Sequence, residues 1–418
     1  MAVLIYWLAI RCYALFIRIA SFFNPKARLF IRGRKDLLSR IRYALINERR
    51  ARIWVHCASL GEFEQGRPVI EQLRKKYPHY AIVLTFFSPS GYEVRKDYEG
   101  VDYVFYLPLD SFSNAKKFID LVQPRLAVFV KYELWYFMLS RCAAKDIPLL
   151  LISAIFREGQ SFFKWYGALH RNMLQCFSHI FVQDNVSVQM LYKIGISNVS
   201  IAGDTRFDRV AESVQQKQQS LSIAESFCND NKILVAGSTW EDDELFLKRA
   251  FEKMPSGWKL IVVPHEVHGT HLNKIEEIFK GDLIRWSHWD NNTDKRVLVV
   301  DKVGLLLQLY SYARVAWIGG GFGKEGVHNV LEAAVYGIPV CYGPIYHQFL
   351  EAQELITEEA GVSFTDADEF AKRIAHWDND PLGYERYAKA AGNYVASHIG
   401  ATKKIMDYIE EKNWLNIP

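Results

Sequence analysis

The sequence predicts an α/β protein with two Rossmann-like, doubly wound parallel sheets that face a cleft, and three observations predict this fold class. A chain of 418 residues is too long for one ordinary core and suits two domains of about 150 to 200 residues each. Nearly continuous apolar runs alternate with helical patterns, which is typical of parallel strands covered by helices on both faces. The alternation is interrupted by a polar, Gln/Ser-rich segment, residues 209–230, and then begins again.

The apolar runs are predicted to be the strands of these sheets. In the first half they are IWVHCA (53–58), AIVLTFF (81–87), YVFYL (103–107), LAVFV (126–130), PLLLISA (148–154), HIFVQD (179–184) and VSIAG (199–203). In the second half they are KILVAG (232–237), KLIVVP (259–264), RVLVV (296–300), RVAWIG (314–319) and IPVCYG (338–343). Ligands bind at the carboxyl ends of the strands in open α/β sheets, so we expect functional side chains in the loops that follow strands.

These patterns also predict the domain organisation. We expect a membrane-anchor helix at residues 1–25, an N-terminal Rossmann-like domain at 26–208 and a connector at 209–230. A C-terminal Rossmann-like domain is expected at 231–385, followed by helices at 386–418 that can pack back on the N-terminal domain.

Residues 2–23 are apolar except for Arg11, Arg18 and a few small polar groups. At about 1.5 Å per residue, a helix of this length approaches the thickness of the bilayer core. Arg11 and Arg18 share one helix face, and each is costly at mid-bilayer unless it snorkels or packs on protein. The segment therefore predicts membrane attachment, as a spanning, tilted or interfacial helix, with a buried first helix as the alternative.

The charge distribution points to an anionic lipid surface. Residues 1–52 hold twelve lysines and arginines against Asp36 and Glu48, within a net charge of +4. Because the positive charge is confined to this segment, the pattern argues against a nucleic-acid binder and favours a cytoplasmic flank beside anionic headgroups. The six cysteines form no C-x-x-C pair and no Cys/His cluster at zinc spacing, so we expect reduced thiols and no metal site.

Two glutamates follow strands of the first half. Glu62 lies where the strand at 53–58 gives way to a helix, whose N-terminus favours an ionised carboxylate. Such a group suits a base that takes a proton from a sugar hydroxyl, although a glutamate on a first turn also serves as a helix cap. Glu133 follows the strand at 126–130, so both carboxylates can meet one acceptor; alternatively Glu133 is a solvated residue at a helix start.

Three further side chains follow strands and suit a phosphate. Arg206, in GDTRFD, can reach the phosphate of a leaving group, unless it is an ordinary surface arginine. Ser238 and Thr239 offer hydroxyls and backbone N–H groups at a helix start, where Ser or Thr is also the usual N-cap.

The block from Gly319 to Glu332 predicts a nucleotide site. Its glycines allow the backbone to approach a ligand closely, and the helix expected after them carries Asn329 and Glu332 on one face. A carboxylate one turn into such a helix can accept both hydroxyls of a ribose while the helix N-terminus faces phosphate. The block also contains the dinucleotide fingerprint G-x-G-x-x-G, but after the fourth strand of its half rather than the first, which argues against NAD.

These motifs, in this order, resemble the Kdo transferase family (3-deoxy-D-manno-octulosonic acid transferases) over essentially the whole chain. WVHCASLGE resembles the family's strand with its S-x-G-E loop, YELW its E-L-W motif, GDTRFD its G-[ST]-x-K-F-D segment and GSTWEDDE its G-S-T-x-x-x-E loop. The block IGGGFGKEGVHNVLEAAVYGIPVCYGP resembles the family's G-G-S-x-x-x-x-G-H-N-x-L-E-A-A-x-x-G-x-P-V-x-x-G-P almost throughout.

The resemblance implies an inverting GT-B type glycosyltransferase that moves Kdo from CMP-Kdo to a lipid A precursor of lipid IVA type in lipopolysaccharide biosynthesis. It implies no cofactor and no metal, and a location at the cytoplasmic face of the inner membrane among anionic lipids. It places the catalytic carboxylate at Glu62, an essential role at Glu133 and a catalytic cation at Arg206, where the family has lysine. The donor-binding positions it implies are Ser238, Thr239, Pro264, His265, Gly304, Gly320, Gly321, His328, Asn329 and Glu332.

The chain departs from the family's pattern at two places. Pro264–Glu266 lacks the arginine of the family's P-R-H motif, and Val300–Leu306 lacks the glutamate of its G-D-T-x-G-E-L segment. Both segments contact nucleotide in the family, so we expect the CMP contacts to differ here. Two alternative functions remain: another two-domain glycosyltransferase that uses a UDP-sugar, and a non-catalytic membrane scaffold.

Overall fold

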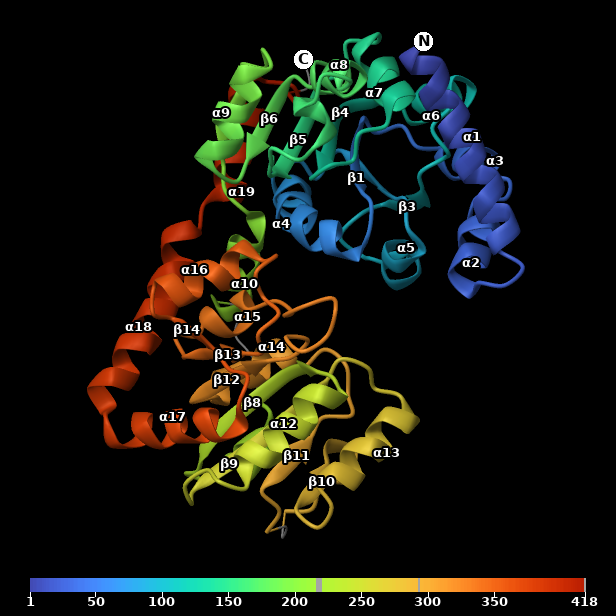
Figure 1. Cartoon of the computed structure of the whole chain (residues 1–418). Helices are drawn as coiled ribbons and strands as arrows, with labels where there is room; N and C mark the ends of the chain where they lie inside the picture. The colour runs from blue at the N-terminus through green and yellow to red at the C-terminus, as the bar shows by residue number, and fades with distance from the viewer. Residues whose placement is uncertain (216–219, 292–293, 417–418) are drawn as a thin grey trace. The chain divides into compact units, whose positions relative to one another are not determined.

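The computed structural model describes residues 1–215, 220–291 and 294–416, and the chain divides into two compact units (Figure 1). The first unit comprises Met1–Arg209 together with Gly400–Pro418, and the second comprises Val210–Ile399. Each unit holds one parallel sheet flanked by helices. The predicted fold class, two Rossmann-like α/β units of GT-B type with an apolar N-terminal helix, is therefore confirmed.

The first unit has a seven-stranded sheet of order β3-β2-β1-β4-β5-β6-β7. Its strands are β1 Arg52–Cys57, β2 Ala81–Phe86, β3 Tyr103–Tyr106, β4 Pro124–Val130, β5 Leu149–Ala154, β6 His179–Val182 and β7 Val199–Ile201. Its helices are α1 Ala2–Ala20, α2 Pro25–Gly33, α3 Leu37–Leu45, α4 Leu60–Lys76, α5 Pro89–Arg95, α6 Phe112–Val122, α7 Tyr136–Ala143, α8 Ala168–Leu174, α9 Asn185–Lys193 and α19 Ala401–Glu411. Helix α10, Thr205–Gln215, begins in this unit and ends in the second.

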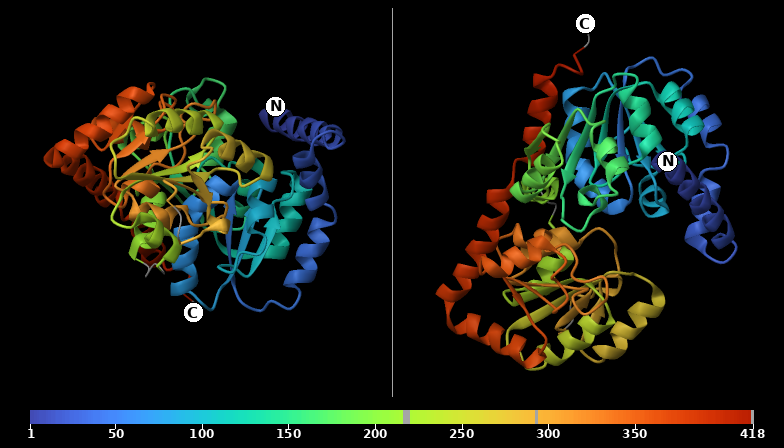
Figure 2. Two further views of the ribbon diagram at one scale, coloured as in Figure 1. Left: turned by 90° about the horizontal axis from the view of Figure 1, so that it is seen from below. Right: turned by 45° about the horizontal axis from the view of Figure 1, so that its top comes forward.

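Alternate side chains of β1 contribute to the apolar cores on the two faces of this sheet. Trp54 points into the layer that contains α3, α6 and α7, whereas Val55 points into the layer that contains α4 and α19. Because successive side chains of a strand point to opposite faces, an apolar strand such as β1 must be covered on both sides. Helix α19, from the end of the chain, runs along the sheet of this unit (Figure 2).

The second unit repeats the architecture with the order β10-β11-β9-β8-β12-β13-β14. Its strands are β8 Lys232–Thr239, β9 Trp258–Pro264, β10 Leu283–Arg285, β11 Val297–Val299, β12 Val315–Ile318, β13 Val340–Tyr342 and β14 Gly361–Ser363. Its helices are α11 Ser222–Cys228, α12 Glu241–Phe251, α13 Gly269–Ile278, α14 Leu306–Leu309, α15 Leu331–Ala334, α16 Leu350–Thr357, α17 Ala367–Asn379 and α18 Pro381–His398. The strands β10 and β14, at the edges of the sheet, were not predicted from the sequence.

The start of α19 is fixed by Asp208 on α10. Its carboxylate accepts hydrogen bonds from the backbone N–H groups of Gly400 and Thr402, both at 2.6 Å. The first N–H groups of a helix have no partner within the helix, so Asp208 acts as a cap supplied from elsewhere in the chain.

We expect Asp208→Ala to lower the free energy of unfolding by about 1 to 2 kcal/mol, because a helix cap of this kind is lost. Thermal unfolding and limited proteolysis around residue 400 would measure the effect. Asp407→Ala, on the exposed face of α19, is the matched control; equal stability of the two variants would contradict the capping role.

Candidate active site

The carboxyl ends of β1 and β4 lie side by side at the point where the strand order of the first sheet reverses. The loops after these strands carry Glu62 and Glu133, so the structure brings the two predicted carboxylates to one edge of the sheet. Burial raises the pKa of the Cys57 thiol at the end of β1, and the negative charges of Glu62 and Glu133 add to the rise. Both carboxylates therefore lie within electrostatic range of the end of β1.

Glu62 lies on the first turn of α4 and takes part in its capping box. One oxygen, Oε2, accepts a hydrogen bond of 3.0 Å from the backbone N–H of Ser59 and a second bond from the Ser59 hydroxyl. The other oxygen, Oε1, has no hydrogen-bond partner among the described residues. The capping interpretation and the catalytic one are thus compatible, because the cap orients the carboxylate and leaves one oxygen to take a proton.

Glu133 belongs to a polar cluster with two aromatic side chains. Its Oε2 accepts a 2.9 Å hydrogen bond from Trp135 Nε1 and lies 3.3 Å from Nε2 of His56. His56 is fully buried, and its Nδ1 lies 2.8 Å from the Thr85 hydroxyl. Nδ1 also lies 3.1 Å from the Thr85 carbonyl, which can only accept, and Nε2 lies 3.3 Å from the indole Nε1 of Trp135. His56, Trp135 and Glu133 therefore form one polar cluster, in which Trp135 is the donor that orients the carboxylate.

Sequence reasoning missed His56. The signal was present, because His56 is the one polar residue of the apolar run at 53–58, and a buried polar side chain needs a partner.

Arg206 lies on the first turn of α10, where its guanidinium contacts Asp204 at 2.8 Å. Burial acts to raise the pKa of Asp204, but the charges of Arg206 and Lys131 outweigh it and hold the pKa below its usual range. Asp204 also accepts a 3.0 Å hydrogen bond from Gln65 of α4, the helix that carries Glu62. The structure thus connects Arg206 to the element that positions Glu62; its predicted contact with a leaving group stays a prediction.

In the second unit the strand order reverses between β8 and β12. The loop after β12 carries Gly320, Gly321, His328 and Asn329, whereas Ser238 and Thr239, predicted to follow a strand, are the last two residues of β8. Asp243, at the start of α12, holds the segments after these two strands together. Its buried carboxylate accepts hydrogen bonds from the N–H of Trp240 (3.0 Å), the N–H of Gly320 (2.8 Å) and the indole of Trp317 (3.1 Å). Sequence reasoning did not identify Asp243, whose partners lie up to 77 positions away along the chain.

The glycines of the block are required by backbone packing within the unit. A Cβ on Gly319 would lie 2.3 Å from the carbonyl oxygen of Ser238, and a Cβ on Gly321 would lie 2.5 Å from the amide of Gly343. Gly320 has φ +88°, a conformation that L side chains rarely adopt. The glycines thus let the segment after β12 contact both the end of β8 and the segment after β13. The same lack of side chains also allows the backbone to approach a ligand.

Asn329 and Glu332 are half-buried and bonded to one another. Asn329 Nδ2 donates to Glu332 Oε1 at 2.9 Å, and Asn329 Oδ1 accepts from the backbone N–H of Leu331. The helix expected to carry both residues begins only at Leu331, so Asn329 precedes it, and that part of the prediction was wrong. The side chains still lie together in a position that can meet the hydroxyls of a ribose.

The remaining predicted residues are placed as follows. Thr239 is fully buried and its hydroxyl donates to Glu244 at 2.9 Å, so this hydroxyl already has a partner. Ser238, with φ +54°, precedes it. Pro264 ends β9, and Gly304 has φ +94° in the loop before α14.

The rings of Trp240 and His265 pack next to His328 of the glycine block. His265 and His328 are stacked with ring centroids 4.4 Å apart, and Trp240 Nε1 donates to His328 Nε2 at 3.0 Å. Burial, assisted by His265, lowers the pKa of His328 from 6.5 to about 4. His328 is therefore neutral at neutral pH, which leaves Nε2 free to accept from Trp240.

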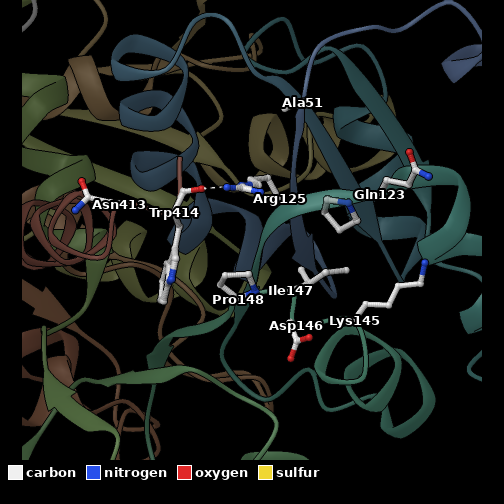
Figure 3. Close-up of a pocket in the computed structure, with 10 residues that line it drawn as sticks. Ala51, Gln123, Arg125, Lys145, Asp146, Ile147, Pro148, Asn413 and Trp414 are labelled. Carbon is white, nitrogen blue, oxygen red and sulfur yellow. Dashed lines mark hydrogen bonds between the residues drawn. The ribbon is translucent and has the colours of Figure 1, made fainter. Parts of the chain in front are cut away.

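Two cavities of the first unit differ in their relation to these residues. One, of about 530 Å³, is lined by Ala51, Arg125, Pro148 and Trp414 at the amino ends of the strands, where Arg125 Nε donates to the carbonyl of Trp414 (Figure 3). It contains none of the predicted site residues. The other, a groove of about 290 Å³, lies between α1, α2 and the loop after β2, and its wall includes Phe87. Phe87 packs on Trp135 with ring centroids 4.4 Å apart, so this groove adjoins the Glu133 cluster.

The described residues contain no group of three or more His, Cys, Asp or Glu side chains that could hold a metal ion.

Known proteins resemble the chain in sequence and in fold. A family model described as 3-deoxy-D-manno-octulosonic-acid transferase (kdotransferase) matches residues 35–209. A 3-deoxy-D-manno-octulosonic acid transferase of Haemophilus influenzae is 27% identical over 86% of this chain and 86% of its own length. One of Aquifex aeolicus is 28% identical over 77% of this chain and 84% of its own. A putative UDP-N-acetylglucosamine 2-epimerase of Listeria monocytogenes shares the fold, with a TM-score of 0.62 at 12% identity over 88% of this chain and 98% of its own.

The paired Rossmann-like sheets, the carboxylates beyond β1 and β4 and these relatives define a glycosyltransferase of GT-B type. More specifically, the chain is similar over most of its length to 3-deoxy-D-manno-octulosonic acid transferases.

We expect the second unit to lose stability as the pH falls from about 6.5 to about 4. The unfolded chain binds a proton at His328 near pH 6.5 whereas the folded chain does not, so stability is fully present above this window and is lost within it. After allowance for partial exposure, the loss attributable to His328 is on the order of 1 to 2 kcal/mol.

Urea unfolding at a series of pH values would measure this loss. His328→Gln, which keeps an acceptor for Trp240 but does not titrate, should flatten the dependence. His268→Gln, at an exposed histidine of the same unit, should not change it. Identical profiles for the His328→Gln variant and the unmodified protein would contradict the assignment.

Proposed function

We propose that the chain is an inverting transferase that moves Kdo from CMP-Kdo to a lipid A precursor in lipopolysaccharide biosynthesis. The observation that carries the proposal is the geometry of Glu62, whose carboxylate is held by Ser59 at a helix N-terminus with Oε1 left open. The relatives named as 3-deoxy-D-manno-octulosonic acid transferases support Kdo as the sugar that is transferred. The donor nucleotide and the lipid acceptor rest on the sequence motifs.

Glu62 acts as the general base. A hydroxyl of the acceptor sugar loses its proton to Oε1 as its oxygen forms a bond to the anomeric carbon of Kdo. The bond from that carbon to the phosphate of CMP breaks on the opposite face, and this single displacement inverts the configuration. Proton transfer of this kind contributes about 10² to 10⁴ in rate. Glu133, held by the indole of Trp135, orients the acceptor hydroxyl.

The leaving group is CMP, and its phosphate requires compensating charge. Arg206 can supply it as a guanidinium that forms charge-assisted hydrogen bonds with phosphate oxygens. In the second unit, the adjoining Asn329 and Glu332 side chains suit the ribose hydroxyls, because the carboxylate can accept from both. The stacked rings of His265 and His328 lie beside the glycine block, where the nucleotide is expected.

The surroundings of Glu133 suit a lipid acceptor. The groove beside it is lined largely by apolar side chains of α1 and α2, including Ile17 and Phe30, and Lys26 lies at its margin. An acyl chain fits the apolar walls, and an anionic headgroup suits the lysine.

Helix α1 supplies a membrane-facing surface. It is apolar and long enough to cross a membrane, but Val3 and Tyr6 on its inner face pack against the core of the first unit. The opposite face exposes large apolar side chains, among them Leu4 (66%), Phe16 (71%) and Ile19 (51%). We propose that α1 lies along the inner membrane on its cytoplasmic side, with this outer face in lipid and the exposed basic residues of α2 at anionic headgroups.

An in-plane position agrees with the contacts of Tyr6 better than a spanning one. Tyr6 lies fourteen residues before the end of α1 at Ala20, roughly 20 Å along the helix axis. In a spanning arrangement this end of the helix would be separated from the first unit by most of the bilayer core, whereas Tyr6 bonds directly to Asp110 of that unit.

We expect Glu62→Gln to reduce transfer of Kdo by at least 10² while CMP binding is retained. Glutamine can also complete a capping box, so the variant keeps the helix start and loses only the base. Product formation from CMP-Kdo and a lipid A precursor, followed by mass spectrometry, and CMP binding by calorimetry would measure the two effects.

Glu64→Gln, on the same helix but paired with Arg95, serves as the control. Near-normal turnover by the Glu62→Gln variant would remove the assignment of the base. Turnover of UDP-sugars but not of CMP-Kdo by the unmodified protein would refute the proposed donor.

We expect an N-terminal epitope tag to remain on the same side of the membrane as the rest of the protein. Full-length protein would be reconstituted into anionic phospholipid vesicles with its two units outside, and protease added. An in-plane α1 predicts cleavage of the tag without detergent, whereas protection of the tag until detergent is added would show that α1 spans the bilayer.

A further inference from the structure

The start of α7 is capped by two side chains from distant parts of the chain. The backbone N–H of Tyr136 donates to the hydroxyl of Tyr6 at 3.3 Å. The N–H groups of Phe137 and Met138 donate to Asp110 at 2.9 and 3.0 Å. The residue at the N-cap position, Trp135, makes no side-chain cap of its own. The first three N–H groups of α7, which have no partner within the helix, are thus satisfied from α1 and from the loop after β3.

Tyr6 completes this cap in two ways. Its hydroxyl accepts from the first N–H of α7 and donates to Asp110 at 2.7 Å. Asp110 is fully buried, so its charge depends on the donors that surround it. Burial raises the pKa of Asp110, while the bonds from Tyr6, Phe137 and Met138 act to lower it. Removal of the Tyr6 hydroxyl therefore leaves one backbone N–H without its partner and one buried carboxylate with a donor fewer.

The capped end of α7 continues directly into the Glu133 cluster. Trp135, immediately before the helix, donates from Nε1 to Glu133 at 2.9 Å. The ring of Tyr6 also contacts the rings of Tyr136 and Phe137, with centroids 6.0 Å apart in both cases. Helix α1 runs beside this end of α7 (Figure 1). A displacement of α1 would therefore change the start of α7, and with it the indole that orients Glu133.

We infer that Tyr6 is a positioning residue for Glu133, so that the N-terminal helix is a working part of the active site as well as a membrane attachment. The inference rests on the proposed function, because the effect it assigns to Tyr6 is an effect on Kdo transfer. It assigns the same positioning role to Asp110, which caps α7 together with Tyr6. Neither residue touches substrate; both act through α7 and Trp135.

The direct test is Tyr6→Phe, which removes one hydroxyl and keeps the ring. We expect kcat for Kdo transfer to fall about tenfold, because a misplaced orienting group raises the activation barrier and a rise of about 1.4 kcal/mol corresponds to this factor. The KM for CMP-Kdo should not change, because the predicted donor-binding residues lie in the second unit. Tyr43→Phe is the matched control, since the Tyr43 side chain is exposed on α3 and its hydroxyl forms no hydrogen bond with the described residues.

A double-mutant cycle separates positioning from general destabilisation. If Tyr6 acts through the indole of Trp135, Tyr6→Phe should lower kcat in the unmodified protein but have little further effect when Trp135→Phe is already present. A purely structural role of Tyr6 would instead lower kcat by the same factor in the unmodified protein and in the Trp135→Phe variant. Thermal unfolding midpoints and vesicle binding of the four proteins would show that each is folded and attached.

The outcomes distinguish this inference from the proposed function. Absence of turnover of CMP-Kdo by the unmodified protein would refute the proposed function itself. Normal kcat in the Tyr6→Phe variant, or equal losses in the two backgrounds of the cycle, would overturn the inference and leave the proposed function standing.

Discussion

The reversal of strand order within each sheet is the constraint on which the candidate site depends. Chain segments that leave β1 and β4, or β8 and β12, emerge from neighbouring strands at the same edge of a sheet. In open α/β sheets this is the place where the connections diverge and where backbone and side-chain polar groups can reach a ligand. Glu62 and Glu133 of one unit, and the end of β8 and the glycine block of the other, occupy these positions because the topology leaves few others available.

The central strands could be predicted from sequence because both of their faces are buried. A strand such as β4, covered on both sides, must be apolar at nearly every position, and this composition is visible in a single sequence. The edge strands β10 and β14 could not be predicted from sequence, because they are three residues long and only partly buried. Their place in the sheet is set by a neighbouring strand rather than by their own residues.

Of the candidate site, the sequence revealed the residues that follow strands and missed those that support them. Glu62 and Glu133 stand next to recognisable strand ends, whereas Asp110 meets Tyr6 across 104 positions of the chain. Asp243 and its glycine partner are also far apart in sequence. A local pattern contains no information about such pairs, since they form only when the sheet is assembled. The short helix after the glycine block was likewise misplaced, because the turn that precedes Leu331 carries no helix-breaking residue.

The return of α19 to the first unit means that this unit is not a continuous piece of the chain. Ile405 and Ile409 complete the apolar layer over β1 and α4 after the chain has traversed the whole second unit. A fragment that ended at Arg209 would expose that layer to water, and the first core cannot be completed during synthesis until α19 has been made. The two halves must therefore mature together, and a circular permutant that places Gly400 ahead of Met1 is the natural route to an N-terminal unit that folds alone.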